Sequence, residues 1–257
     1  RAERPARERF ERLEVEGLTY SHPGTSDGLR GVSFAVERGE FVVVTGRIGS
    51  GKTTLLRVLL GMLPKEGGEV RWNGRVVDDP ASFFVPPRSA YTSQVPRLFS
   101  DSLRENVTLG RDLTDAEVQE ALELAVLAPD VAAMQAGLET EVGARGVRLS
   151  GGQVQRAAAA RMLLQDAELL VFDDISSALD VDTERRLWDG LFAHGEVTCL
   201  VVSHRRAALE RADRVVVLDE GCVVAQGSLE EVLPVMPELA LLAEEPAAAP
   251  TVARASD

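Results

Sequence analysis

Cysteine is scarce in this sequence, and long hydrophobic runs are missing altogether. The 257 residues include two cysteines, Cys199 and Cys222, each inside an apolar run and without CxxC or other metal-ligand spacing. We therefore expect two reduced, buried thiols in a reducing compartment. No stretch approaches the ~20 apolar residues that a membrane-spanning helix needs. The charged N-terminal residues also lack the pattern of a signal peptide.

Basic residues are in the minority as well. The chain has 28 lysines and arginines against 41 aspartates and glutamates, which gives a net charge of −13. Indiscriminate nucleic-acid binders usually present a basic face, so we expect no nucleic-acid partner. The hydrophobic share of 45% is enough to bury one good core, and we find no internal repeat.

Short apolar runs alternate with helical patterns along most of the chain. Strands alternating with helices predict an α/β fold with a mostly parallel sheet. The segment at about 100–164 has no convincing strand and is predicted to be an inserted helical subdomain. The sequences TDAE (114–117) and SLEE (228–231) predict capping boxes at helix starts. The predicted strands lie near 41–45, 90–92, 169–173, 198–202 and 214–218.

One glycine-rich stretch fits a phosphate-binding loop without a mismatch. GRIGSGKT (46–53) lies between the strand-like FVVVT and the helical TTLLRVLLGML, which is the context that such a loop requires. Its glycines let the backbone fold around an anion, and the helix adds its positive N-terminal end. Lys52 can reach the β- and γ-phosphates, and the Thr53 hydroxyl can ligate Mg²⁺. The predicted nucleotide-binding residues here are Gly46, Arg47, Ile48, Gly49, Ser50, Gly51, Lys52, Thr53 and Thr54.

A second strand-like run, LLVF (169–172), ends in two adjacent carboxylates, Asp173 and Asp174. Neighbours on a strand point to opposite faces, so the two cannot do the same task from the same place. In phosphate-loop nucleotidases an aspartate at the end of a second strand holds Mg²⁺, and we assign that role to Asp173. Asp174 would then face the attacking water. Uncompensated buried carboxylates repel one another, so a nearby metal makes chemical sense.

The sequence LSGGQ (149–153) precedes the helical pattern VQRAAAARMLL. Ser150, Gly151 and Gly152 open this helix with small side chains, which leaves backbone N–H groups accessible to an anion. This second phosphate site cannot share one ATP with the first within a compact chain. With this motif the sequence resembles the ATP-binding cassette (ABC) family, whose signature is LSGGQ, over roughly residues 13–233.

The other marks of the family follow in the expected order. Tyr20 matches the aromatic residue that stacks on adenine, and Gln94, in AYTSQ, matches the Q-loop glutamine. SALD (177–180) matches the D-loop, and His204, in VVSHR, matches the switch histidine. Each of these residues alone would be interpreted as an ordinary packing or loop residue. Only their occurrence together in this order supports the family resemblance. His22 matches no motif and is expected to be structural.

The resemblance implies an ABC-type P-loop NTPase fold, with a mostly parallel core sheet, an antiparallel β subdomain and an inserted helical subdomain. It implies ATP and Mg²⁺ as cofactors, and a head-to-tail pair of cassettes in which the phosphate loop of one and the LSGGQ of the other hold the same ATP. Nucleotide contacts outside the loop would come from Tyr20, Gln94, Ser150, Gly151, Gly152 and Gln153. The implied metal ligands are Thr53, Gln94 and Asp173, and the implied catalytic residues are Lys52, Gln94, Asp174 and His204.

Two further segments, RLFSDSLRENVTLG (97–110) and TEVGARG (140–146), resemble the exporter branch of the family. An exporter cassette is usually fused after six membrane helices and lies at the cytoplasmic face of the membrane. We therefore expect residues 1–12 to be a linker from a membrane domain, residues 13–243 the nucleotide-binding domain, and residues 244–257 a flexible tail. A separately encoded membrane subunit stays open, as does the cargo.

Asp174 departs from the family, which normally has glutamate at the position that polarises water. Aspartate is shorter by one CH₂, about 1.5 Å, and misplacement on that scale can cost ~10²-fold in rate. In several heterodimeric exporters such an aspartate marks a slow site, so we expect a degenerate site and a different partner cassette. A regulatory cassette that hydrolyses slowly or not at all stays open as an alternative. A soluble ABC ATPase unrelated to transport is the other, although its usual long coiled coil is missing between 53 and 149.

Overall fold

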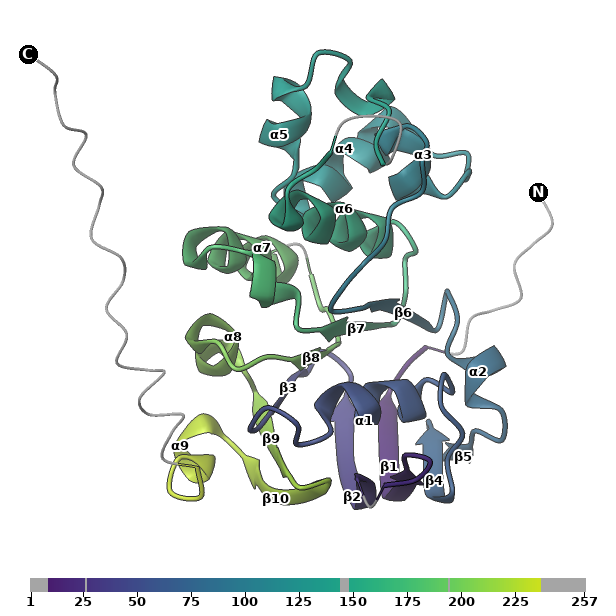
Figure 1. The fold of residues 1–257 in the computed structure, drawn as a ribbon, viewed down its shortest axis with the longest axis vertical. Helices are drawn as coiled ribbons and strands as arrows, with labels where there is room; N and C mark the ends of the chain where they lie inside the picture. The colour runs from purple at the N-terminus through teal and green to yellow at the C-terminus, as the bar shows by residue number, and fades with distance from the viewer. Residues whose placement is uncertain (1–8, 26, 144–147, 194, 237–257) are drawn as a thin grey trace, which may run out of the picture.

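The computed structural model describes residues 9–25, 27–143, 148–193 and 195–236. Its centre is a six-stranded sheet with the order β10-β9-β3-β8-β7-β6 (Figure 1). All neighbouring pairs are parallel except β9 with β10. The mostly parallel core sheet and all five predicted strands are therefore confirmed. The strands are β3 (Phe41–Thr45), β6 (Ser89–Thr92), β7 (Leu169–Asp173), β8 (Cys199–Val202), β9 (Arg214–Asp219) and β10 (Cys222–Gly227).

Both faces of the central sheet are buried, which explains the continuous apolar runs of its strands. Alternate residues of β3 belong to two different core clusters: Phe41 and Val43 to one, Val42 and Val44 to the other. In the first cluster, Trp188 packs on Phe41 with a ring-centroid distance of 5.2 Å. This cluster lies under the helices α7 (Val181–Ala193) and α8 (Arg206–Arg211) and extends into the helical subdomain.

The second core cluster joins the central sheet to a four-stranded antiparallel sheet with the order β2-β1-β4-β5. Helix α1 (Lys52–Leu59) buries four leucine and valine side chains between them. The predicted antiparallel β subdomain is thus confirmed. Its strands are β1 (Arg12–Ser21), β2 (Gly28–Glu37), β4 (Gly67–Trp72) and β5 (Arg75–Val76), and the short helix α2 (Pro80–Phe83) follows them.

The helical subdomain lies at the top of Figure 1, on the far side of β6 and β7 from the antiparallel sheet. In its described residues the only strand-like contact is an isolated bridge between Ser102 and Glu141. The predicted capping boxes at Thr114 and Ser228 are both present, the second at helix α9 (Leu229–Val232). The subdomain holds α3 (Leu103–Thr108), α4 (Asp115–Leu124), α5 (Ala128–Ala133), the 3₁₀ turn η1 (Gly137–Glu139) and α6 (Gly151–Leu163).

The fold begins before residue 13, within the segment that the linker prediction covered. Phe10 is fully buried and lies 4.4 Å from Trp72 between ring centroids, and Arg12 opens β1. An apolar side chain with an aromatic partner is held by the core, although charged residues surround it in the sequence. Residues 1–8 and 237–257 lie outside the described residues, so the linker and the tail stay predictions. Among the described helices, none has the length and hydrophobicity needed to cross a bilayer.

Candidate active site at the edge of the central sheet

The predicted site residues gather at the carboxyl ends of β3, β8, β7 and β6, which are adjacent in the sheet. This edge is where open α/β sheets bind their ligands. The glycine-rich loop follows β3, Gln94 lies two residues beyond β6, and Asp173 ends β7. His204 lies two residues beyond β8 and is exposed. Four segments that are distant in the sequence therefore meet at one edge.

The glycine-rich loop between β3 and α1 wraps around the ammonium group of Lys52. The Lys52 Nζ donates hydrogen bonds to the carbonyl oxygens of Gly46 and Arg47, both at 2.7 Å. Gly46 has φ 143°, and a Cβ there would lie 1.9 Å from the carbonyl oxygen of Leu218, so a side chain does not fit. Gly51 caps α1 with φ 101°. The loop therefore has the curvature of an anion cradle with a cation at its base.

Burial lowers the pKa of Lys52, and the nearby carboxylates of Asp174 and Asp173 raise it in opposition. The lysine thus lies within electrostatic reach of both acids. A phosphate group entering the loop would meet this cation together with the positive N-terminal end of α1.

Asp173 is 1% exposed, and both of its carboxylate oxygens accept a hydrogen bond from a hydroxyl group. Thr53 Oγ1 donates to Oδ1 at 2.9 Å, and the Tyr91 hydroxyl donates to Oδ2 at 3.1 Å. Burial raises the pKa of Asp173, and these two hydrogen bonds oppose the rise. Burial also raises the pKa of Tyr91 to about 12, so its hydroxyl stays protonated at neutral pH.

The residues present fit a Mg²⁺ ion that arrives with phosphate groups. Within the described part of the chain, no three His, Cys, Asp or Glu side chains are grouped to hold a metal on their own. Mg²⁺ needs no such cage, since one or two carboxylates together with substrate phosphates usually bind it. The Asp173 carboxylate and the Thr53 hydroxyl, which meet beside the phosphate loop, are oxygen ligands of that kind.

Asp174 faces a different neighbour from Asp173, because it lies just beyond the end of β7 and not on the strand. Its backbone leaves the strand in a left-handed conformation, φ 50° and ψ 51°, and its N–H donates to the Val202 carbonyl at 3.0 Å. Oδ2 accepts a hydrogen bond from Gln94 Nε2 at 3.0 Å. Oδ1 is buried and accepts no hydrogen bond from the described residues. The side chain is therefore oriented by Gln94 through Oδ2.

Tyr20, predicted to stack on adenine, is 6% exposed and belongs to the second core cluster. It shares the inward face of β1 with Leu18, so its ring faces are covered and not open to a base. His22 follows on the same face beyond the strand end and is only half-buried. Its Nδ1 lies 3.5 Å from the Tyr20 hydroxyl and its Nε2 lies 3.2 Å from Thr54 Oγ1.

Sequence reasoning therefore missed His22 and Tyr91. The alternation along β1 could not have indicated His22, because Tyr20 and His22 lie on the same face and a register shift between Val15 and Leu18 interrupts the pattern. Nothing in the sequence indicates Tyr91, because its contact with Asp173 depends on the parallel register of β6 and β7, in which Tyr91 lies opposite Val171.

The LSGGQ segment begins α6 in the helical subdomain, away from α1 in Figure 1. Ser150 and Gln153 form a reciprocal capping box, and Gln153 Nε2 also donates to Asp130 Oδ1 at 2.8 Å. A Cβ on Gly152 would lie 2.8 Å from the Ala178 carbonyl, so glycine permits a close contact with the turn η2 (Ile175–Ala178). The first N–H groups of a helix have no partner within it, so this helix start can hold an anion.

Comparison with known proteins agrees with this geometry. The family model described as ABC transporter matches residues 29–177. An ATP-dependent lipid A-core flippase of Burkholderia orbicola (strain AU 1054) is 43% identical over 204 residues, which cover 79% of this chain and 34% of the flippase. A probable multidrug resistance ABC transporter ATP-binding/permease protein of Bacillus subtilis (strain 168) is 36% identical over 219 residues, 84% of this chain and 37% of that protein.

A solved structure is similar over nearly the whole chain. It is the structure of a bacterial Atm1-family ABC exporter with ATP bound, with a TM-score of 0.84 and 29% sequence identity, and the match covers 92% of this chain and 43% of that one. The chain spans about a third of the length of the curated relatives that it matches.

Proposed function

The chain belongs to the ABC transporter family, and on that premise we propose that it is the ATP-hydrolysing domain of an exporter at the cytoplasmic face of a membrane. The observation that carries the proposal is the meeting of Lys52, Thr53, Asp173 and Asp174 at one edge of the sheet, with the LSGGQ helix start elsewhere. The matched segments are only 34% and 37% of two relatives, and one of these is an ATP-binding/permease protein. By analogy with these relatives, the proposed transporter also has a membrane domain, fused upstream of the folded residues that begin with Phe10.

In the proposed reaction the residues act mainly by position and charge. The phosphate loop and Lys52 hold the β- and γ-phosphates, and Thr53 and Asp173 would bind Mg²⁺, which neutralises charge on the phosphate oxygens. Asp174 takes the proton of the attacking water, while His204 contacts the γ-phosphate. Gln94 holds Asp174 Oδ2 at 3.0 Å, so movement of the Gln94 segment would change the direction of the base.

The second cassette supplies the LSGGQ segment that this chain cannot bring to its own phosphate loop. Exposed apolar side chains support a pairing surface beside the site. Ile48, at the tip of the phosphate loop, is fully exposed, and Val181, after the D-loop segment 177–180, is 54% exposed. Because Asp174 is shorter than the usual glutamate, we propose a slow site on this chain and a different cassette as its partner.

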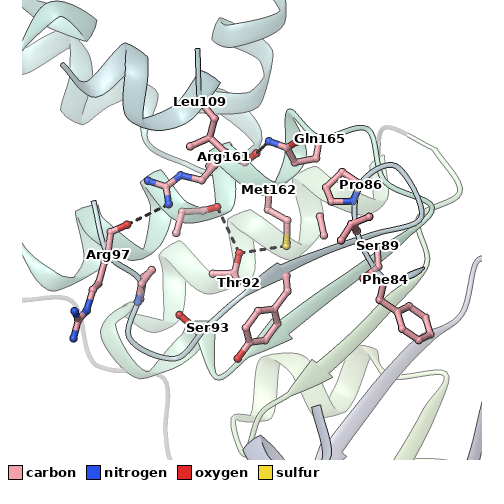
Figure 2. A pocket seen from close by; sticks show the side chains of 15 residues that line it. Phe84, Pro86, Ser89, Thr92, Ser93, Arg97, Leu109, Arg161, Met162 and Gln165 are labelled. Atoms are coloured by element: carbon pink, nitrogen blue, oxygen red, sulfur yellow. Dashed lines mark hydrogen bonds between the residues drawn. The ribbon is translucent and has the colours of Figure 1, made fainter. Parts of the chain in front are cut away.

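This chain has a groove of about 330 Å³ beside the Gln94 segment, and the groove is the proposed docking site for the membrane domain (Figure 2). Its wall on one side is β6 and on the other α6, joined by a hydrogen bond from Thr92 Oγ1 to Met162 Sδ at 3.2 Å. Arg161 donates to the Arg97 carbonyl at 3.2 Å, which fixes the segment that follows β6. Leu109 lies at the rim, 46% exposed. A segment seated here would press on the residues next to Gln94, which supports this groove as the contact that links transport to hydrolysis.

Sedimentation of the chain with nucleotide tests the proposal. Asp174→Asn, which removes the base, is expected to remain monomeric with ADP. With MgATP at high protein concentration two copies should pair even without the proposed different cassette, because each copy carries both a phosphate loop and an LSGGQ segment. Lys52→Ala is expected to stay monomeric under both conditions. A chain that neither binds ATP nor changes its mass with ATP would contradict the proposed function.

We expect His22, and not Tyr20, to contact the adenine ring. Stacking of a base on an aromatic ring contributes ~1–3 kcal/mol, so His22→Ala should weaken ATP binding by about 5- to 150-fold with little change in Tm. Tyr20→Ala should instead lower the stability by ~3 kcal/mol, as truncation of a buried aromatic residue does. ATP affinity and thermal unfolding are measured on both variants. A Tyr20 variant that keeps its Tm and loses ATP affinity would restore the original assignment.

A further inference from the structure

Each oxygen of the Asp173 carboxylate accepts a hydrogen bond, one from Thr53 and the other from Tyr91. The Tyr91 hydroxyl lies 3.1 Å from Oδ2, and Thr53 Oγ1 lies 2.9 Å from Oδ1. The sheet fixes the distance between donor and acceptor, since β6 and β7 are paired in parallel with Tyr91 opposite Val171 and Thr92 opposite Phe172. The Tyr91 ring packs against the second core cluster, so the hydroxyl is anchored by both backbone and side chain.

The hydroxyl groups of Thr53 and Tyr91 are expected to have different roles once a nucleotide is bound. Thr53 is itself a predicted metal ligand in the loop–helix junction, so its oxygen has a second task. Tyr91 is not part of the phosphate loop, and its hydroxyl donates to Asp173 while the Arg57 side chain also interacts with it. A hydrogen-bond partner behind a metal ligand fixes the orientation of that ligand, and its loss typically weakens metal affinity 10- to 100-fold.

We propose that Tyr91 is a positioning residue for the magnesium site: it holds Asp173 Oδ2 so that Oδ1 points to the Thr53 hydroxyl and to the place where the metal joins the phosphates. The inference rests on the proposed function, because it presumes that the chain binds nucleotide together with Mg²⁺. It assigns to β6 a role in metal binding that is separate from the Gln94 segment following the same strand.

The experiment measures ADP affinity of the whole chain with Mg²⁺ and with EDTA, so that no turnover is needed. Tyr91→Phe keeps the ring in the core and removes only the donor. It is expected to reduce the Mg²⁺-dependent gain in ADP affinity ~10- to 100-fold, to raise the Mg²⁺ concentration at half-effect by the same factor, and to leave affinity in EDTA unchanged. Tyr91→Met, which also lacks the hydroxyl, should do the same if it retains the cooperative unfolding of the unchanged chain.

Two controls separate the possible outcomes. Asp173→Asn should remove the Mg²⁺-dependent gain altogether. Thr108→Val removes a buried hydroxyl that donates to the Arg104 carbonyl at 3.0 Å in α3, and should leave the gain unchanged. If Tyr91→Phe keeps the full gain, or weakens ADP equally in EDTA, the inference is overturned. If the unchanged chain shows no Mg²⁺-dependent gain, the proposed function itself fails.

Discussion

Lys52→Ala is expected to weaken ATP binding by a factor between about 30 and several thousand. Removal of one partner from a desolvated, hydrogen-bonded charge pair costs ~2–5 kcal/mol, which corresponds to that range. The side chain has a second role, because its Nζ bonds to the Gly46 and Arg47 carbonyls and so closes the loop around itself. The alanine variant loses both the charge and this internal support. Equilibrium titration with ATP on the purified chain measures the effect.

Lys65 provides the matched control, because it is the other lysine in the sequence. Its Nζ donates to the Gly68 carbonyl at 3.3 Å in an exposed turn of the antiparallel subdomain. Lys65→Ala removes an equal charge and should leave ATP affinity unchanged. Lys52→Arg should bind ATP only slightly more tightly than Lys52→Ala. A planar guanidinium does not reproduce a compact ammonium that donates to two carbonyls within the loop. If the ATP affinity of Lys52→Ala is within twofold of that of the unchanged chain, the assignment of this loop to the nucleotide-binding site is wrong.

The central sheet was predictable because burial on both faces leaves a direct trace in the sequence. FVVV and LLVF are apolar throughout, and every residue of β3 and β7 is buried. The phosphate loop was predictable for a related reason, since a backbone that approaches the Leu218 carbonyl so closely excludes a side chain at Gly46. In both cases one physical constraint restricts the residue types at neighbouring positions, so it can be recognised in a short stretch of sequence.

The contacts between segments that are distant in the sequence could not be predicted from a local sequence pattern. Tyr20 and His22 are two residues apart, both aromatic and on the same face, and only the end of β1 at Ser21 separates the core residue from the half-buried one. Tyr91 reaches Asp173, 82 residues away in the sequence, across the β6–β7 strand pair. The side chains of Ser150 and Gln153 cap α6, so the anion-binding capacity predicted for that segment rests on its backbone N–H groups.

Asp174→Glu is expected to raise the rate of ATP hydrolysis at this chain's site by up to ~10²-fold, the cost that misplacement on the scale of one CH₂ can carry. The longer side chain would carry its carboxylate further from the backbone, which the bond to the Val202 carbonyl holds at the end of β7. Asp174 also occupies a left-handed conformation that aspartate tolerates better than glutamate, so the same change should cost ~1 kcal/mol of stability. Single-turnover hydrolysis and thermal unfolding measure the two effects.

Asp173→Glu is the matched control, because it adds the same CH₂ to the neighbouring carboxylate. It should lower the rate, since both oxygens of Asp173 are already in hydrogen-bonding range of Thr53 and Tyr91. In the assembled transporter the gain from Asp174→Glu should be confined to the site built on this chain's phosphate loop, because the LSGGQ of this chain serves the other site. An Asp174→Glu variant with unchanged turnover would mean that carboxylate length does not limit the reaction. The hydrogen bond from Gln94, which fixes the direction of the base, would then be the next determinant to test.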